Sequence, residues 1–311
     1  MSIQISAIIC TYNRADYLRK SLQSLAEQTL NSDLYEIAVV DNHSTDNTKQ
    51  VATEEFAGVS NLRYIYEPIL GLSQARNTGW QKAKGEYIAY LDDDAIADSF
   101  WLEKILKAFK TVTPQPGCVG GKIELLWEVE KPDWLPPQFF PYLGLINWSN
   151  APMILKDERY ISGGNMAVPR SLLEVLGGFN VKLGRKGHNL LSNEELFLLD
   201  RMKQQGYSIY YDPEIVIAHH VQASRLTKHW FVKRHYWQGV SDALIAIERE
   251  SLPMQKRIHL GMIKLKKLFK SPKQFAYLFL SSSNKNRLSV KCDTWKQIGY
   301  IWALFTLKDI I

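Results

Sequence analysis

The chain has 311 residues, of which 46% are apolar and 23% charged. This is the composition of a globular protein with one large domain or two smaller ones, and it excludes a disordered chain. The net charge of +6 is uneven, because residues 253–311 hold 12 Lys and Arg against 2 Asp and Glu, while the residues before them hold 26 against 30. A basic tail of this kind suggests an anionic partner, either a nucleic acid or a membrane surface.

The three cysteines, Cys10, Cys118 and Cys292, are far apart and show no C-x-x-C spacing. We therefore expect neither disulfides nor a thiolate zinc site. A reducing compartment fits this pattern best. The start MSIQISAIIC lacks the features of a signal peptide, and no apolar run approaches the roughly 18 residues of a spanning helix. These features predict a cytoplasmic protein, with any membrane contact peripheral and on the inner face.

Strands and helices alternate through the first hundred residues. Short apolar segments typical of strands alternate with segments whose leucines or caps are typical of helices. The expected strands are 3–10, 36–41, 61–68 and 86–94, and the expected helices are 16–28, 44–56 (capped by Ser44 or Thr45) and 72–84. This order predicts an α/β fold with a mostly parallel sheet flanked by helices.

The following residues continue with mixed elements and end in helices. We expect helices at 98–112, 171–179, 192–206 and 226–250, amphipathic segments at 256–270 and 294–307, and strands at 116–127, 159–170 and 207–221. Residues 132–148 are rich in proline and aromatic side chains and predict a long ordered loop or flap.

Polar side chains follow three of the expected strands. The first ends in Thr11-Tyr12-Asn13-Arg14, the second in Asp41-Asn42, and the fourth in the triplet 92–94 of three aspartates. The carboxyl ends of parallel strands meet at one edge of a sheet, where ligands bind in such folds. One such ending would be an ordinary loop start, but three together predict a site.

The aspartate triplet suits a divalent cation. Alternate residues of a strand share one side, so Asp92 and Asp94 would face the site while Asp93 faces away. Two carboxylates on one side suit Mg²⁺ or Mn²⁺ held together with the phosphates of a nucleotide. The alternative is a solvated acidic turn before a helix.

Five segments, in this order and at these separations, resemble the family-2 glycosyltransferases, which have the GT-A fold. They are ISAIICTYNRADYLRKSLQSL, IAVVDNHSTDNT, GLSQARNTGWQKAKGEYIAYLDDD, SGGNMAVPR with LGGF, and NEELFLLDRMKQQG. The resemblance covers roughly residues 3–240. It implies a GT-A domain at 1–225, with a nucleotide-binding half (1–118) and an acceptor-binding half (119–225), followed by a helical basic region at 226–311.

The resemblance implies a nucleotide site at the strand ends. Thr11 and Tyr12 would line the base and ribose pocket, and Asp41 would accept the N3 proton of uracil. Arg14 would reach the diphosphate, with a solvated side chain as the alternative. Arg76 would contact base or phosphate, with a salt bridge to a helix neighbour as the alternative.

The resemblance also implies a metal site and a general base. Asp94 would hold Mn²⁺ or Mg²⁺, and Asp92 would contact the ribose or sugar, while Asp93 could take either part if the strand ends early. His219, rather than His220, would complete the metal shell. One acid of the pair Glu194-Glu195, preferentially Glu195, would remove the proton of the acceptor hydroxyl. A charged helix N-terminus is the alternative explanation of that pair.

Two further segments would approach the substrates. The turn of Gly163, Gly164 and Asn165 would bring backbone close to the donor sugar. The aromatic residues of the loop would form either an acceptor platform or a small hydrophobic cluster; they are Trp134, Phe139, Phe140, Tyr142 and Trp148.

The expected activity is transfer of a sugar from a UDP-sugar to a saccharide or lipid-linked acceptor, with inversion and a divalent metal. A nucleotidyltransferase is the alternative enzyme, although CTYNRADYL lacks the glycines such enzymes place after the first strand.

A third interpretation is a non-catalytic protein that binds through its basic tail. Four lysines, Lys264, Lys266, Lys267 and Lys270, stand among Leu265, Leu268 and Phe269. This mixture suits an anionic membrane surface at 253–311. The face could also pack on the chain itself or on a second subunit of a homo-oligomer, and a nucleic acid is not the partner we expect.

Overall fold

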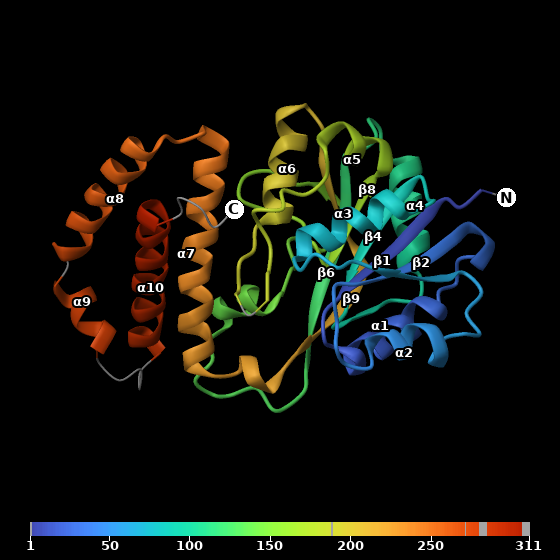
Figure 1. The fold of residues 1–311 in the computed structure, drawn as a ribbon, viewed down its shortest axis with the longest axis horizontal. Helices are drawn as coiled ribbons and strands as arrows, with labels where there is room; N and C mark the ends of the chain where they lie inside the picture. Colours follow the sequence, from blue (N-terminus) through green and yellow to red (C-terminus); the bar gives the residue numbers. More distant parts are fainter. Residues whose placement is uncertain (1, 188, 271, 280–284, 307–311) are drawn as a thin grey trace. The chain divides into compact units, whose positions relative to one another are not determined.

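The computed structural model describes residues 2–187, 189–270, 272–279 and 285–306. The chain forms two compact units, and Figure 1 shows their elements. The first unit holds 1–126, 144–181 and 194–220, and the second holds 127–143, 182–193 and 221–311. Residues 1, 188, 271, 280–284 and 307–311, which include Leu307 of the last predicted helix, lie outside the described residues.

One mixed sheet organises the first unit. Its strand order is β3-β2-β1-β4-β8-β6-β9-β5, with β7 paired to β9. The strands are β1 (Ile5–Thr11), β2 (Tyr35–Asp41), β3 (Leu62–Tyr66), β4 (Tyr87–Asp92), β5 (Ala95–Ala97), β6 (Cys118–Trp127), β7 (Met153–Ile154), β8 (Asn165–Pro169) and β9 (Ile209–Val221).

The four strands from β3 to β4 are parallel. β8 pairs antiparallel with β4 and β6, and β9 pairs antiparallel with β5 and β7. The strands β1, β2 and β4 are almost wholly buried, as expected for a sheet covered on both faces. Figure 1 shows α1 and α2 on one side of these strands and α3 on the other. Gly79 of α3 makes the closest approach, since a Cβ there would lie 2.8 Å from the Ile8 side chain.

The helices of the first unit follow the predicted pattern closely. Leu18, Leu22 and Leu25 of α1 are fully buried, which confirms the leucine spacing as a core face. The α-helices are α1 (Ala15–Ala26), α2 (Thr48–Gln50), α3 (Leu72–Lys82), α4 (Trp101–Thr111), α5 (Arg170–Leu176) and α6 (Glu194–Gln204). Short 3-10 or π-helical segments are η1 (Ser32–Leu34), η2 (Val51–Glu55) and η4 (Ala223–Arg225), the last in the second unit.

One predicted cap is wrong. The helix after β2 has Asn47 as its N-cap residue rather than Ser44 or Thr45. The Ser44 hydroxyl accepts a hydrogen bond from the amide of Asn13 and therefore does not cap the helix. Asp46 accepts a hydrogen bond from the amide of Thr48. The hydrogen bond between the loop after β1 and Ser44 is therefore consistent with the later start of this helix.

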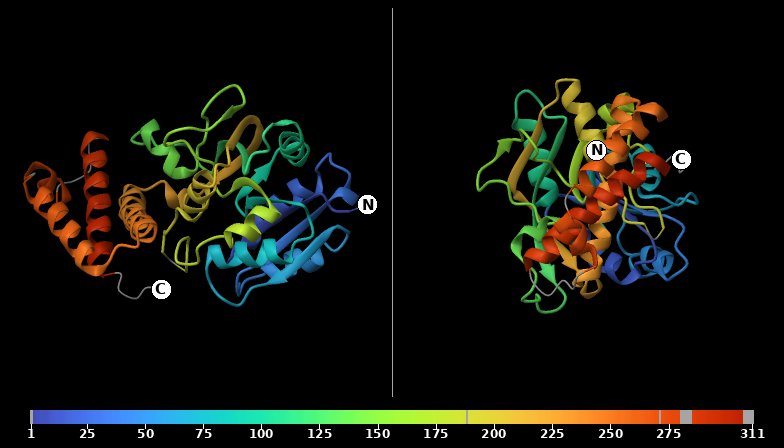
Figure 2. Two further views of the ribbon diagram at one scale, coloured as in Figure 1. Left: turned by 90° about the horizontal axis from the view of Figure 1, so that it is seen from above. Right: turned by 90° about the vertical axis from the view of Figure 1, so that its left-hand side faces the viewer.

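The second unit is mainly helical. It contains η3 (Pro137–Leu143), α7 (Lys228–Glu250), α8 (Met254–Phe269), α9 (Pro272–Phe279) and α10 (Lys285–Thr306). In Figures 1 and 2, α10 lies against both α7 and α8. Within the described residues, no helix has the length and hydropathy needed to cross a membrane.

Two glycines let α7 and α10 approach closely. A Cβ at Gly239 would lie 1.9 Å from the carbonyl oxygen of Lys296, and one at Gly299 would lie 2.0 Å from that of Tyr236. Ala243 and Ala303 stand one turn further along each helix and are fully buried. Small residues at this spacing allow the two backbones to pack directly against each other, so α7 and α10 form the most closely packed helix pair described here for the second unit.

Candidate active site

The three polar strand endings meet at one edge of the sheet. The register places Thr11 opposite Asp41 on β2, and Cys10 opposite Asp92 on β4. These strand endings, the glycine turn at 163–164, the pair Glu194-Glu195 and His219 all belong to the first unit. The prediction that these endings converge is confirmed by this register.

Two aspartates and a histidine form a candidate metal site. Ligand atoms of Asp92, Asp94 and His219 all lie within 4.8 Å of one another. His219 Nε2 is 3.2 Å from Asp94 Oδ1, because β5 and β9 pair with Ala95 opposite His219. Two carboxylates and one imidazole fit a divalent cation, and the imidazole favours Mn²⁺ over Mg²⁺, which is bound mainly through oxygen.

Arg14 forms ion pairs with two aspartates of the triplet, Asp93 and Asp94. Its Nη1 lies 2.7 Å from Asp93 Oδ1 and 2.9 Å from Asp94 Oδ2. The expectation that Asp93 faces away from Asp94 is therefore wrong. β4 ends at Asp92, and the following turn no longer alternates its side chains. Burial raises the pKa of Asp93, while the charge of Arg14 opposes that rise.

Arg76 ties the triplet to the second acidic pair. Its Nη1 is 2.6 Å from Glu194 Oε1, and its Nη2 is 3.5 Å from Asp92 Oδ1. The Arg76 side chain is only 4% exposed. The guanidinium thus pairs with two carboxylates, which matches the salt bridge that was the alternative to a contact with base or phosphate. An ion pair this deeply buried must remain intact, because either partner alone would be an uncompensated charge.

Glu195 differs from its neighbour in its surroundings. Burial raises the pKa of Glu195 to about 8; the charge of Glu194 adds to the rise, and the charge of Arg76 opposes it. In the described part of the chain, Glu195 Oε2 has no hydrogen-bond partner. The two acids are therefore divided between an ion-paired residue, Glu194, and one that can accept a proton near neutral pH, Glu195.

Two glycines pack directly on these groups. A Cβ at Gly163 would lie 2.6 Å from Arg76 Nη2, and one at Gly164 would lie 2.3 Å from Asp92 Oδ2. Side chains at either position would displace the guanidinium or the carboxylate. The glycines are thus required by the site itself.

Asp41 is held at the end of β2 by two donors. Tyr64 Oη donates to Asp41 Oδ2 at 2.7 Å, and the amide of Ser44 donates to Oδ1 at 2.8 Å. Each carboxylate oxygen can accept a further hydrogen bond. Thr11 is buried opposite Asp41, and Tyr12 beyond it is half-buried.

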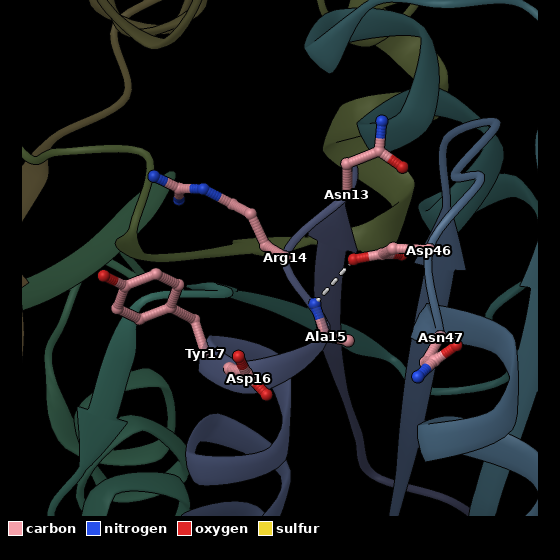
Figure 3. A pocket seen from close by; sticks show the side chains of 7 residues that line it. All are labelled: Asn13, Arg14, Ala15, Asp16, Tyr17, Asp46 and Asn47. Atoms are coloured by element: carbon pink, nitrogen blue, oxygen red, sulfur yellow. Dashed lines mark hydrogen bonds between the residues drawn. The ribbon is translucent and has the colours of Figure 1, made fainter.

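A pocket of about 330 Å³ opens beside the β1–α1 loop (Figure 3). Asp46 Oδ2 accepts the amide hydrogen of Ala15 at 3.1 Å, the interaction drawn in the figure. The pocket is lined by Asn13, Arg14, Ala15, Asp16, Tyr17, Asp46 and Asn47. It therefore adjoins the candidate metal site through Arg14, whose guanidinium reaches the aspartates.

The consecutive histidines point to different neighbours. His219 lies on Asp94, whereas the ring of His220 contacts Tyr17, with centroids 5.8 Å apart. Successive side chains of a strand alternate faces, which accounts for the different neighbours of the two rings.

Asn165 and Phe139 have mainly packing contacts. The Asn165 side chain is fully buried, accepts a hydrogen bond from Trp101 Nε1 and donates to two backbone carbonyls. Phe139, in the second unit, is buried and stacks on Phe231 with centroids 5.0 Å apart. The other aromatic residues of the predicted loop are half-buried: Trp134, Phe140, Tyr142 and Trp148.

Tyr64 and Asp46 were not identified from sequence. Tyr64 orients Asp41, and Asp46 ties the β2–α2 loop to the start of α1. The strand spacing of Tyr64 and Tyr66 was an available signal, since alternate residues share a face. No local pattern identified Asp46, because its partner Ala15 is 31 residues away.

Known proteins resemble this chain along most of its length. Glucosyl-dolichyl phosphate glucuronosyltransferase of Haloferax volcanii is 25% identical over 243 residues, which is 77% of this chain and 76% of that protein. Succinoglycan biosynthesis protein ExoM of Rhizobium meliloti is 23% identical over 315 residues, which is 99% of this chain and 95% of that protein.

Solved structures share the fold. Mannosyltransferase PcManGT from Pyrobaculum calidifontis, in complex with GDP-Man and Mn²⁺, superposes with a TM-score of 0.65 at 20% identity, over 99% of this chain and 89% of that one. Staphylococcus aureus TarS gives a TM-score of 0.54 at 17% identity, over 97% and 90%. These likenesses confirm the predicted GT-A fold with a helical C-terminal region.

The sequence profile of Glycosyl transferase family 2 matches residues 6–177, more than half of the chain. The match covers the strand endings, the aspartate triplet and the two glycines described above, and it favours sugar transfer over nucleotidyl transfer. The chain therefore belongs to glycosyl transferase family 2 and is a glycosyltransferase.

Proposed function

We propose that this enzyme is a metal-dependent, inverting glycosyltransferase that moves a sugar from a nucleotide donor to a hydroxyl group of a saccharide or a lipid-linked acceptor. One observation carries the proposal: the cluster of Asp92, Asp94 and His219 lies at the strand ends and is linked through Arg76 to the pair Glu194-Glu195. A metal-binding group and a candidate base thus flank the same edge of the sheet.

The donor is a UDP-sugar in our first proposal, with a GDP-sugar as the alternative. Asp41 can accept further hydrogen bonds, and both uracil and guanine present N–H donors on their pairing edges. The solved mannosyltransferase that shares the fold binds GDP-Man. We assign Thr11 and Tyr12 to the same base and ribose pocket.

Asp94 and His219 hold the metal in this proposal, with Asp92 as a further ligand or a contact to ribose or sugar. When bound, Mn²⁺ or Mg²⁺ offsets the negative charge that develops on the leaving diphosphate. Arg14 keeps about a quarter of its side chain exposed, so we retain it as a contact to the donor phosphates while it neutralises Asp93.

Glu195 is the proposed general base. Glu194 is ion-paired with Arg76, whereas burial raises the pKa of Glu195 to about 8. A carboxylate with a raised pKa is a stronger base once ionised, which suits removal of a hydroxyl proton during attack. Attack by the deprotonated hydroxyl in a single displacement inverts the anomeric centre. Gly164 and the backbone of Asn165 would approach the donor sugar.

The acceptor proposal draws on relatives. One similar protein acts on glucosyl-dolichyl phosphate and another belongs to succinoglycan biosynthesis, so both lipid-linked and saccharide acceptors are proposed. We propose that 1–118 bind the nucleotide and 119–225 the acceptor, and that the basic region 226–311 meets a membrane. Free cysteines suit the cytoplasmic side of that membrane.

A donor screen by thermal shift tests the assignment. The protein is heated with UDP-, GDP- and dTDP-sugars, each with and without Mn²⁺. A ligand that binds the folded state raises the unfolding temperature, and we expect one donor to do so only with metal. The absence of a shift for every nucleotide sugar would contradict the proposal.

Two variants separate the roles. Asp94→Asn should lose the metal-dependent shift, while Glu195→Gln should keep it and lose sugar transfer. Asp33→Asn, at an exposed position of η1, is the matched control for the first, and Glu174→Gln on α5 for the second. Unchanged transfer by Glu195→Gln would show that another residue is the general base.

A further inference from the structure

Helix α8 in the second unit has apolar side chains on two sides. One side is buried, where Gly261 and Leu268 pack in the unit and a Cβ at Gly261 would lie 2.6 Å from the ring of Phe305. Lys264 lies over the ring of Tyr300, with Nζ 4.4 Å from the centroid. This side accounts for the attachment of α8 to α10.

A second side carries large apolar residues that are exposed to solvent. Ile258 is 45% exposed, Met262 45% and Phe269 62%, and Leu265 between them is half-buried. These positions follow one another at spacings of four, three and four residues, so they form a single row along the helix, which we name the outer stripe. A row of this kind is unfavourable in water unless something covers it.

The charges around the outer stripe have one sign. Residues 251–292 contain ten Lys and Arg and neither Asp nor Glu. Lys256, Lys266, Lys267 and Lys270 on and beside α8 are exposed. In the part of the chain that the structure describes, none of the four pairs with a carboxylate. Their charge is therefore available to an external anion.

The composition of this face selects among occupants. A second copy docked through the same face would bring lysines against lysines with no acid between them, which is repulsive in a symmetric dimer. A nucleic acid would pair with the lysines but leave the outer stripe uncovered or buried against a polar backbone. An anionic bilayer surface meets both requirements, because acyl chains cover the apolar row and headgroups pair with the lysines.

We propose that α8 is an interfacial helix that docks this glycosyltransferase on a membrane containing anionic lipids, with the outer stripe facing the acyl chains. The inference extends the proposed function, because a lipid-linked acceptor would give this membrane binding its biological purpose. The binding itself needs no transfer reaction.

Vesicle flotation of the full chain tests the proposal. The protein is mixed with vesicles of phosphatidylcholine alone or with phosphatidylserine added, at low and high salt. We expect flotation with the anionic vesicles, weakening as salt screens the lysines, and little flotation with phosphatidylcholine alone. A donor thermal shift on the same samples reports the proposed function separately, so that failure of one leaves the other standing.

Matched variants assign the binding to α8. The triple variant Lys256→Gln, Lys266→Gln and Lys267→Gln should bind anionic vesicles on the order of 100-fold more weakly, from about fivefold for each lysine. Three exposed lysines of the first unit provide the control variant, which should bind like the unsubstituted protein: Lys20→Gln, Lys107→Gln and Lys203→Gln.

A second pair of variants tests the outer stripe. Ile258→Ser with Met262→Ser and Phe269→Ser should lose flotation even at low salt, whereas the equally exposed Val175→Ser and Val181→Ser of the first unit should keep it. Unfolding curves check that each variant folds, and Ile258→Ala with Met262→Ala replaces any that does not.

Three outcomes would overturn the proposal. The first is equal flotation with neutral and anionic vesicles, or wild-type flotation of both α8 variants. The second is tight binding of a nucleic acid, measured by fluorescence anisotropy, together with no vesicle binding. The third is a dimer in light scattering that the serine substitutions dissociate, because the outer stripe would then be covered by a second copy.

Discussion

Replacing Gly164 by alanine should damage the metal site without damaging the fold. The added Cβ would lie 2.3 Å from Asp92 Oδ2 and 2.6 Å from its Cγ, whereas ordinary contacts are about 3.5 Å. The carboxylate must therefore retreat by about 1 Å. A displacement of that size in a reacting site typically costs about 100-fold in rate, so we expect a loss of that order.

The assay measures binding and turnover on the same samples. Mn²⁺ affinity is measured by calorimetric titration, and turnover by nucleotide release with the donor selected in the screen. Gly58→Ala is the control, because a Cβ there meets nothing within 4 Å. The Asp92 side chain is 38% exposed and can move into solvent, so we expect the variant to fold. Circular dichroism checks this.

Wild-type Mn²⁺ affinity and turnover in folded Gly164→Ala protein would refute this reasoning. Asp92 would then have no role that depends on its position. The isosteric variant Asp92→Asn gives an independent reading, because it removes the charge and leaves the glycine contact unchanged. If it too behaves like wild type, the metal site reduces to Asp94 and His219.

Three further predictions concern the buried charges and the helix pair. Arg76→Met should lower the free energy of unfolding in urea by about 3–5 kcal/mol, because it leaves buried carboxylates unpaired; Arg19→Met, at an exposed pair, should lower it by less than about 1 kcal/mol, and equal effects would contradict the burial argument. Transfer should rise about tenfold from pH 7 to a plateau above pH 9, because only about a tenth of Glu195, whose pKa is raised to about 8, is ionised at pH 7; a flat profile would exclude it as the base. Gly239→Leu should separate α7 from α10 and lower the unfolding temperature and the helical circular dichroism signal, and an unchanged melting curve would refute the close packing.

Local patterns account for the elements and for where the site lies. The burial of Leu18, Leu22 and Leu25 follows from helical spacing, and the buried strands β1, β2 and β4 follow from continuous apolar runs. Parallel strands bring their carboxyl ends to one edge, so the sequence alone predicts that Asp41 and the aspartate triplet lie close together.

The partners of the charges did not follow from local patterns. Arg76 and Glu194 are 118 residues apart, and Arg14 lies 79 and 80 residues from the two aspartates it joins. Which cation meets which carboxylate depends on how the strands and loops pack, and a sequence pattern carries no information about that choice. The expectation for Asp93 was wrong because the alternation of a strand ends with the strand.

The sequence by itself determined the α/β order, the family, the acidic edge of the sheet and the basic character of the C-terminal region, because each depends on residue type and near spacing. Only the tertiary structure decided which acids share a cation, how closely Gly164 approaches Asp92, and which face of α8 is exposed. These are matters of distance between segments remote in the chain, and they are set when the core packs.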